Sequence, residues 1–307
     1  MQTRSIGSLR VSVVGIGCNN FGARLDQSGT DSVVAAALEA GINLFDTADI
    51  YGATKSEEYL GRALGSRRDE VVLATKFGMP IDDQRSGAAP AYVLKACDDS
   101  LTRLGTDRID LYQLHAPDAS VPIAETLDAL RELKVAGKVR EIGCSNFTAE
   151  QLDEARAASQ GPDEFRSVQN QYSLLWRAPE ADGVLTACDR LEMAFLPFYP
   201  LANGLLTGKV RPGVPPPEGT RLAKMPPERS AHWLSDEFTA RVGSLLDFAH
   251  DHGVSLLSLA FSWLLAHDQV ASVIAGATNA EQVRANAAAP IELADGVRDA
   301  LDALTAT

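Results

Sequence analysis

Four residues whose side chains can together move a proton lie within the first 115 positions of this chain. Asp46 and Tyr51 stand five positions apart in NLFDTADIYG, residues 43–52, while Lys76 and His115 each close a later apolar run. A phenol has an ordinary pKa of about 10, and a neighbouring ammonium lowers that pKa because it favours the phenolate. The set predicts a general acid that protonates an oxygen as negative charge develops on it.

Each of these residues alone also has an ordinary structural interpretation. A single tyrosine usually packs, a lysine is usually solvated, a histidine is usually hydrogen-bonded structure, and Asp46 alone would suit a helix cap. Four of them at the ends of three consecutive apolar runs form a chemical set instead. No Ser-His-Asp arrangement or GxSxG motif competes, and a lysine among acids disfavours a bound cation, so we expect no metal.

Eight short apolar runs predict the strands that position these side chains. Several runs are apolar at successive positions, which is typical of strands buried on both faces. Helical patterns alternate with them, one opened by a capping box of Thr148 and Gln151. The alternation predicts an α/β fold, a (β/α)8 TIM barrel forming a single domain over residues 1–307. The runs cover residues 11–17, 42–45, 70–76, 108–115, 139–145, 167–172, 194–200 and 271–276.

Segments outside this alternation predict additions to the barrel. Residues 4–11 predict an N-terminal β-hairpin that closes the barrel bottom. Residues 200–230 are rich in proline and glycine and predict a long functional loop. Extra C-terminal helices are expected at about 235–250, 255–266 and 291–305. Because barrel active sites lie at the C-terminal ends of the strands, the four reactive residues should converge on one mouth.

Composition excludes some partners. The formal net charge of −13 argues against nucleic acid and against an anionic membrane surface. No apolar run is long enough for a membrane span, and the N-terminus lacks a signal-peptide core. The four cysteines form no CxxC pair, so we expect reduced thiols and a cytoplasmic protein.

Two glycine-containing stretches bear on phosphate binding without matching a standard motif. GIGCNNFG, residues 15–22, lacks the GxGxxG fingerprint, and GLLTGK, residues 204–209, lacks P-loop spacing. Barrels often bind phosphate after strands seven and eight, which is where GLLTGK and residues 273–286 fall. Asn279 and Gln282 are candidate cap partners for a helix there. A dinucleotide can therefore lie across the mouth.

The motifs together resemble the aldo-keto reductase family. GINLFDTADIYGATKSEEYLG, residues 41–61, resembles its first signature, and LATKFG, DLYQLHAPD, IGCSNF, VQNQYSLL, LANGLLTGK and IAGATNAEQVRAN follow in family order. The resemblance implies a barrel that reduces small aldehydes and ketones with NADPH, less often NADH. It implies Tyr51 as the general acid, tuned by Asp46 and Lys76, with His115 orienting the substrate carbonyl.

The resemblance also implies a cofactor site around the mouth. Ser145, Asn146 and Gln169 would hold the nicotinamide carboxamide, and Phe198 would supply a stacking ring. The complete expected set is Gly17, Cys18, Asn19, Asp46, Ser145, Asn146, Gln169, Phe198, Tyr199, Leu201, Gly204, Leu205, Thr207, Lys209, Gly276, Thr278, Gln282 and Asn286.

One departure from the family pattern concerns the 2′-phosphate of NADPH, which favours a cation. The stretch GATNAEQ has no basic residue before Arg284. NADPH remains the expected cofactor, NADH is the alternative, and Lys209 or Arg221 would compensate. We expect a monomer with a substrate pocket near Phe21, His115, Trp176 and residues 200–230. The rival functions are a cofactor-sensing regulatory subunit resembling potassium-channel β subunits, and an isomerase or lyase.

Overall fold

The structure, a computed structural model, describes residues 1–159, 161 and 163–306. Its centre is a parallel eight-stranded sheet with the strand order β10-β3-β4-β5-β6-β7-β8-β9. The Phe195 N–H donates to the Gln269 carbonyl at 2.7 Å and the Ala271 N–H donates to the Phe195 carbonyl at 3.0 Å, which closes the sheet into a barrel. The barrel strands are β3 Val14–Gly17, β4 Leu44–Asp46, β5 Val72–Phe77, β6 Ile109–Leu114, β7 Val139–Ser145, β8 Ser167–Gln171, β9 Ala194–Phe198 and β10 Val273–Gly276.

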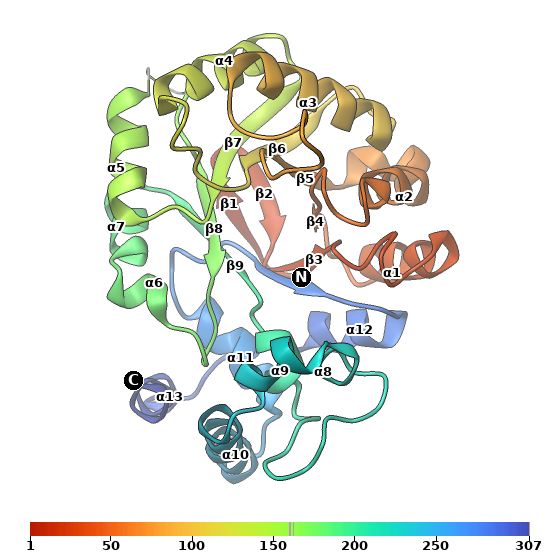
Figure 1. The fold of residues 1–307 in the computed structure, drawn as a ribbon. Coiled ribbons are helices and arrows are strands. Elements are labelled where there is room, and N and C mark those ends of the chain that lie inside the picture. Colours follow the sequence, from red (N-terminus) through yellow and green to blue (C-terminus); the bar gives the residue numbers. More distant parts are fainter. Residues whose placement is uncertain (160, 162, 307) are drawn as a thin grey trace.

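Helices surround this barrel largely in chain order (Figure 1), so the predicted (β/α)8 barrel is confirmed. Each of the first helices packs against the next, and α12 returns beside α1. The helices are α1 Gln27–Glu39, α2 Lys55–Leu64, η1 Gly65–Glu70, α3 Pro90–Leu104, α4 Ile123–Val135, α5 Ala149–Ala158, α6 Ala178–Ala181, α7 Val184–Leu191, η2 Ala202–Thr207, α8 Arg221–Lys224, α9 Pro227–Trp233, α10 Asp236–Asp251, α11 Leu256–Leu265, α12 Ala280–Ala288 and α13 Val297–Thr305.

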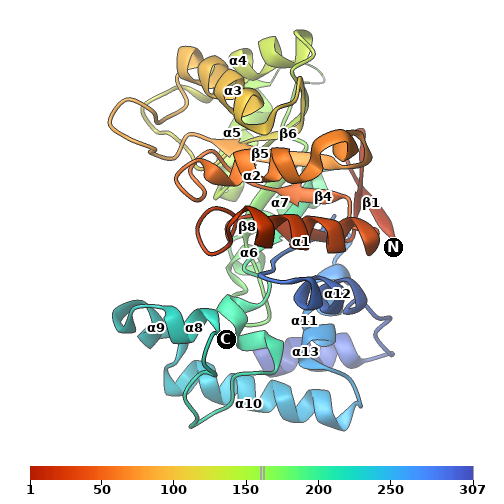
Figure 2. The ribbon, with the colours of Figure 1, turned by 90° about the vertical axis from the view of Figure 1, so that its right-hand side faces the viewer.

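Local signals set several of these boundaries. The predicted capping box is present, with Thr148 accepting from the Gln151 N–H while the Gln151 side chain accepts from the Thr148 N–H. Residues 200–230 are not one open loop, because η2, α8 and part of α9 occupy them. The last helix begins at Val297 rather than near residue 291. Figure 2 shows α8, α9 and α10 at the opposite end of the molecule from α3 and α4.

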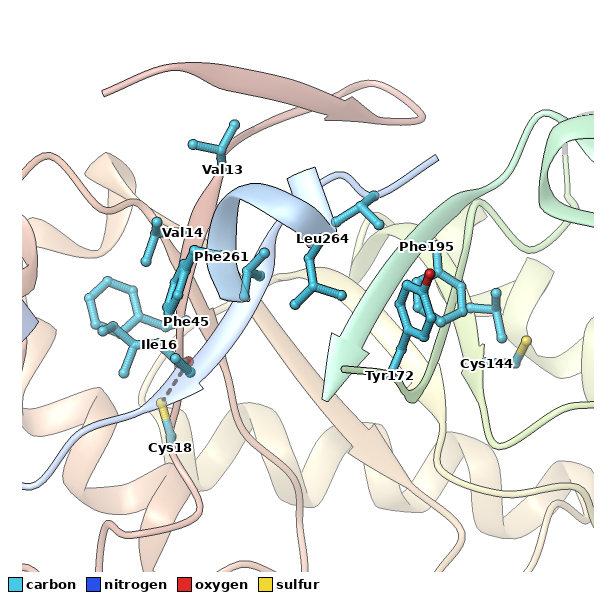
Figure 3. Close-up of a cluster of buried hydrophobic side chains, with 14 of the residues drawn as sticks. Val13, Val14, Ile16, Cys18, Phe45, Cys144, Tyr172, Phe195, Phe261 and Leu264 are labelled. Atoms are coloured by element: carbon cyan, nitrogen blue, oxygen red, sulfur yellow. Dashed lines mark hydrogen bonds between the residues drawn. The ribbon is translucent and has the colours of Figure 1, made fainter. Parts of the chain in front are cut away.

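The predicted N-terminal hairpin is present and plugs the barrel. Strands β1 Thr3–Ile6 and β2 Leu9–Ser12 pair antiparallel. Ile6, Leu9 and Val11 are almost fully buried and belong to the same apolar cluster as the barrel residues Leu44 and Leu111. A second, larger apolar layer separates the strands from the helices, and Figure 3 shows part of it. The hairpin therefore leaves the opposite, C-terminal mouth as the open end.

Close packing between α2 and α3 depends on Gly61. A methyl group added there would lie 2.2 Å from the carbonyl oxygen of Leu104, a backbone atom that cannot swing aside. We expect Gly61→Ala to lower the free energy of unfolding by about 1–3 kcal/mol, because overpacking forces backbone shifts. Urea unfolding followed by circular dichroism measures this change. The control Arg62→Ala removes an exposed ion pair to Glu58 and a contact at 6.0 Å with the Tyr59 ring, and should cost about 0.5 kcal/mol or less. Equal unfolding midpoints for both variants would contradict the packing argument.

Candidate active site

Neighbouring strands bring the four reactive side chains to one end of the barrel. Asp46 ends β4, Lys76 lies near the end of β5, and His115 directly follows β6. The loop after β4 carries Tyr51 and is bonded to β5, because the Asp49 N–H donates to the Lys76 carbonyl at 3.1 Å. The sequence prediction that these residues converge is therefore confirmed in position, while their roles stay predictions.

The centre of the site is a buried ion pair. Lys76 Nζ lies 2.6 Å from Asp46 Oδ2 and also donates to the Thr47 carbonyl at 3.0 Å. Both side chains are almost inaccessible to solvent. The other carboxylate oxygen, Asp46 Oδ1, accepts from Gln113 Nε2 at 3.1 Å and from Gln169 Nε2 at 2.9 Å. Each oxygen of the carboxylate thus has a partner, which offsets much of the cost of burying the charges.

Tyr51 stands between this pair and His115. The Lys76 ammonium lies 5.2 Å from the centre of the Tyr51 ring, and the His115 ring meets the Tyr51 ring edge-on at 5.8 Å. Tyr51 and His115 face the cavity at the barrel mouth, and Lys76 lies behind them. A ligand in the cavity would therefore meet the phenol and the imidazole, but would not touch the ammonium.

The phenol does not have the lowered pKa that the sequence predicts. Burial raises the pKa of Tyr51 above its ordinary value of 10.0, and this outweighs the opposing charge and hydrogen bond of Lys76. Burial alone would lower the pKa of Lys76, but Asp46 and Tyr51 more than compensate, so the pKa of Lys76 is raised. At neutral pH the site therefore holds a protonated phenol beside a charged ammonium, which is the state an acid needs before reaction.

His115 is neutral in this environment. Burial, and then the charge of Lys76, lowers the pKa of His115 from 6.5 to about 3. Its Nδ1 atom is buried and has no hydrogen-bond partner among the described residues. A neutral imidazole can donate one hydrogen bond to an oxygen without competing for the proton that Tyr51 carries.

A cavity of about 420 Å³ opens over these side chains. Three cationic residues, Arg24, Lys209 and Arg221, contribute to its wall. The acidic residue among its described lining is Asp46, whose charge is matched by Lys76. A protein with a net charge of −13 thus presents a cationic cavity wall, which suits an anionic ligand.

Most of the residues expected at the cofactor line this cavity. They are Gly17, Asn19, Asp46, Ser145, Asn146, Gln169, Phe198, Tyr199, Leu201, Gly204, Thr207, Lys209, Gly276, Thr278, Gln282 and Asn286. Cys18 and Leu205 are fully buried and are not in the lining, so their side chains do not face the cavity, and their expected role at the cofactor stays a prediction. Figure 3 shows Cys18 in the apolar layer, where its thiol contacts the Ile16 carbonyl at 3.6 Å.

The expected substrate pocket also needs correction. Phe21 is fully buried, Trp176 is 38% exposed, and neither lines the cavity. Trp233 packs against His232 and Phe238 and is likewise absent from the cavity lining. His115 and several residues of the 200–230 segment do line the cavity, as predicted.

The proposed carboxamide residues form a connected group. Ser145 Oγ donates to the Gln169 carbonyl at 2.7 Å, and Asn146 Nδ2 donates to the His115 carbonyl at 2.9 Å. Gln169 uses its amide nitrogen on Asp46, and its Oε1 accepts no hydrogen bond within the described part of the chain. These hydrogen bonds fix the orientation of the group, and Gln169 Oε1 can still accept a hydrogen bond from a ligand.

The segment after β9 has an unusual backbone. Tyr199, Ala202 and Asn203 have φ values of 51°, 44° and 57°, and Gly204 follows at 102°. Non-glycine residues seldom adopt these left-handed values, and such strain clusters at ligand sites. All but Ala202 line the cavity, so the strained backbone forms part of its wall.

The far end of the cavity carries no basic residue from α12. Asn279 caps this helix by accepting from the Gln282 N–H at 2.9 Å, as predicted, and Gln282 Oε1 accepts from the Thr278 N–H. Arg284 instead pairs with Glu39 on α1 at 3.6 Å, away from the cavity lining. The cations that face the cavity come from other loops.

Sequence reasoning missed several residues of the site. Gln113 lies two positions before His115, so strand alternation places both side chains on the same face and could have found it. The Asn203–Gly204 dipeptide is a turn signal that could have identified Asn203. Asn20 and Arg24 follow β3 in an irregular loop, where no periodic signal marks them.

The geometry defines a (β/α)8 protein with a tyrosine and a buried ion pair beside a cavity whose wall is cationic. The family model "Aldo/keto reductase family" matches residues 13–306. The oxidoreductase YqkF of Bacillus subtilis is 35% identical, covering 93% of this chain and 90% of that protein. A probable voltage-gated potassium channel subunit beta of Arabidopsis thaliana is 32% identical over the same shares. The holo structure of aldo-keto reductase AKR11C1 from Bacillus halodurans superposes with a TM-score of 0.82 at 32% identity, covering 99% of this chain and 96% of that chain. The chain belongs to the aldo/keto reductase family, and it is an oxidoreductase.

Two searches of the described residues bear on other kinds of site. None of the helices there is both long and apolar enough to cross a membrane. No group of three or more histidine, cysteine, aspartate or glutamate side chains is placed there to hold a metal ion.

The buried ion pair generates a stability prediction. Lys76→Met should lower the free energy of unfolding by about 3–5 kcal/mol, because it leaves the Asp46 carboxylate buried without its counter-charge. The double variant Asp46→Asn with Lys76→Met should recover part of that loss, since no unpaired charge remains. Urea unfolding of the two single variants and the double variant gives the coupling between the residues. Strictly additive losses would show that the two groups do not interact.

Proposed function

We propose that this protein reduces aldehydes and ketones with a nicotinamide cofactor and that Tyr51 is its general acid. The observation that carries the proposal is a protonated phenol held between a buried ammonium and a neutral imidazole, facing a cavity whose wall is cationic. The reductive direction needs a proton donor at the carbonyl oxygen, and this arrangement provides one.

The residues present fit a nicotinamide dinucleotide. The cationic side chains suit its phosphates, and the unpaired acceptor on Gln169 suits its carboxamide. When bound, the nicotinamide supplies the hydride. Tyr51 Oη gives its proton to the substrate oxygen, and Lys76 stabilises the phenolate that remains. His115, neutral, donates a hydrogen bond to the same oxygen, and Asp46 keeps Lys76 charged and oriented.

We propose NADPH as the cofactor, with NADH as the alternative. Lys209 and Arg221 face the cavity, and a 2′-phosphate favours such cations. Arg221 also lies over the Tyr199 ring at 5.2 Å, which orients its guanidinium. Arg284 is engaged by Glu39, so it does not support NADPH.

A regulatory role is the second candidate, because the similar Arabidopsis thaliana protein is named a probable potassium channel subunit beta. Such a protein would bind the cofactor with little turnover and would assemble with a membrane partner. We favour the reductase, because Asp46, Tyr51 and His115 line the cavity and Lys76 lies directly behind them, paired with Asp46. Turnover of a generic aldehyde, measured together with the size of the protein in solution, distinguishes the reductase from the regulatory subunit.

We propose further that the chain acts as a single-domain, cytoplasmic monomer on a small carbonyl compound.

Removing the phenolic hydroxyl tests the assigned acid. Tyr51→Phe should lower kcat by roughly 10²–10⁴-fold, the usual contribution of general acid catalysis, while cofactor affinity changes little. Absorbance of the reduced nicotinamide measures the rate, and fluorescence titration measures the cofactor Kd. The control Tyr59→Phe alters a tyrosine of α2 that does not line the cavity and should leave both values unchanged. Full activity in Tyr51→Phe would transfer the acid role to His115 or water.

Cofactor preference can be tested at Lys209. Lys209→Ala should raise the Kd for NADPH by roughly tenfold and the Kd for NADH by less, since a charge-assisted contact to phosphate is lost. The matched control is Arg284→Ala, which removes a cation that lies outside the cavity lining. Equal effects of Lys209→Ala on both cofactors would place this lysine at the shared pyrophosphate. A larger effect of Arg284→Ala would contradict the assignment.

A further inference from the structure

A second buried carboxyl group lies in the loop that carries the proposed acid. Asp49 stands between Asp46 and Tyr51, and its side chain is completely inaccessible to solvent. Neither of its carboxylate oxygens has a hydrogen-bond partner among the described residues. An ionised carboxylate buried in this way is very unfavourable, whereas a neutral carboxylic acid is much less so.

The surroundings of Asp49 offer it no cation of its own. Arg103, on α3, donates to the fully buried Glu57 of α2 at 2.6 Å, and Thr75 donates to the other oxygen of Glu57 at 2.6 Å. Tyr112, on β6, has a buried hydroxyl that also lacks a partner in the described chain. The titratable and charged groups that face Asp49 are Glu57 from α2, Tyr92 and Arg103 from α3, Lys76 from β5 and Tyr112 from β6.

These surroundings favour the protonated form. Burial, and then the negative charge of Glu57, raises the pKa of Asp49 from 3.8 to about 7, although Arg103 and Lys76 oppose the shift. The other groups of the site titrate elsewhere, since the pKa of His115 is about 3 and those of Tyr51 and Lys76 are raised above 10. Asp49 is thus a buried carboxyl, unpartnered among the described residues, whose raised pKa lies near neutrality.

The backbone links Asp49 to the reacting groups. The Thr47 N–H donates to the Ala74 carbonyl, the Thr47 carbonyl accepts from Lys76 Nζ, and the Asp49 N–H donates to the Lys76 carbonyl. These bonds fix the loop against β5 just before Tyr51. An ionised Asp49 would need water, and a displacement of this loop from β5 would admit it.

We propose that Asp49 is a positioning residue: the residue 47–51 loop stays on β5 while the buried carboxyl is neutral, and ionisation of this carboxyl displaces the loop with Tyr51 and lowers turnover. This inference rests on the proposed function for its effect on turnover. Its effect on the loop itself is independent of any activity.

Hydrogen exchange of the whole protein tests the loop directly. Amides of residues 47–51 in the wild type should exchange roughly tenfold faster at pH 8 than at pH 6, after correction for the intrinsic rate. Asp49→Asn cannot ionise and should show no such increase. The control Asp83→Asn removes an exposed carboxylate and should behave as the wild type. Equal pH dependence in the wild type and in Asp49→Asn would overturn the proposal.

Unfolding and turnover give two further readings. A carboxyl pKa raised on folding means that the folded state binds more protons between about pH 4 and pH 7, so stability falls as pH rises through this window. The urea midpoint of the wild type should fall between about pH 4 and pH 7 relative to that of Asp49→Asn.

Turnover gives a separate reading. Between pH 6 and pH 8, kcat of the wild type should fall roughly tenfold and that of Asp49→Asn less than twofold. An unchanged kcat profile alongside altered exchange would refute the effect on catalysis. If the wild type reduces no carbonyl compound, the proposed function fails, and exchange and unfolding alone decide the role of Asp49. If Asp49→Asn does not fold, the wild-type exchange at the two pH values decides it.

Discussion

A lysine ammonium inside a barrel needs a carboxylate within hydrogen-bond distance, and the contact between Lys76 and Asp46 at 2.6 Å meets that need. The charges are nearly removed from water, so the electrostatic influence of the pair is stronger than at a surface. Gln113 and Gln169 bind the second carboxylate oxygen and thereby connect β6 and β8 to the pair. Tyr51, His115 and the proposed carboxamide group are all arranged around this one contact.

Much of this arrangement follows from strand periodicity and barrel geometry alone. Eight apolar runs predict eight strands, and parallel strands in a barrel must bring their C-terminal ends together. Asp46, Lys76 and His115 end such runs, so their convergence needs no information on distance. Capping at Thr148 and Asn279 was also predictable, because a cap is a local interaction between residues three positions apart.

Other features depend on tertiary structure that a single sequence does not express. The pKa of Tyr51 reflects the balance between burial and one ammonium, and the degree of burial is known only when the mouth is assembled. Cys18 follows Gly17 directly, yet its side chain enters the apolar layer while Gly17 lines the cavity. The irregular segments with Arg24 and Arg221 have no period from which a direction can be deduced. The short helices α8 and α9 begin at local signals, since Thr220 caps α8 and Pro227 opens α9, but the proline and glycine content around them indicates a loop.

The division of the site along the chain has an evolutionary consequence. The four groups assigned to proton transfer all lie between residues 46 and 115, whereas the walls with Lys209, Arg221 and the start of α12 come from the last third of the chain. Lys209 and Arg221 make no hydrogen bond or ion pair to Asp46, Tyr51, Lys76 or His115 in the described chain, so substitutions at these cations can leave that group in place. If the proposed function holds, descendants of such a barrel can change their dinucleotide preference while the residues between 46 and 115 are inherited unchanged.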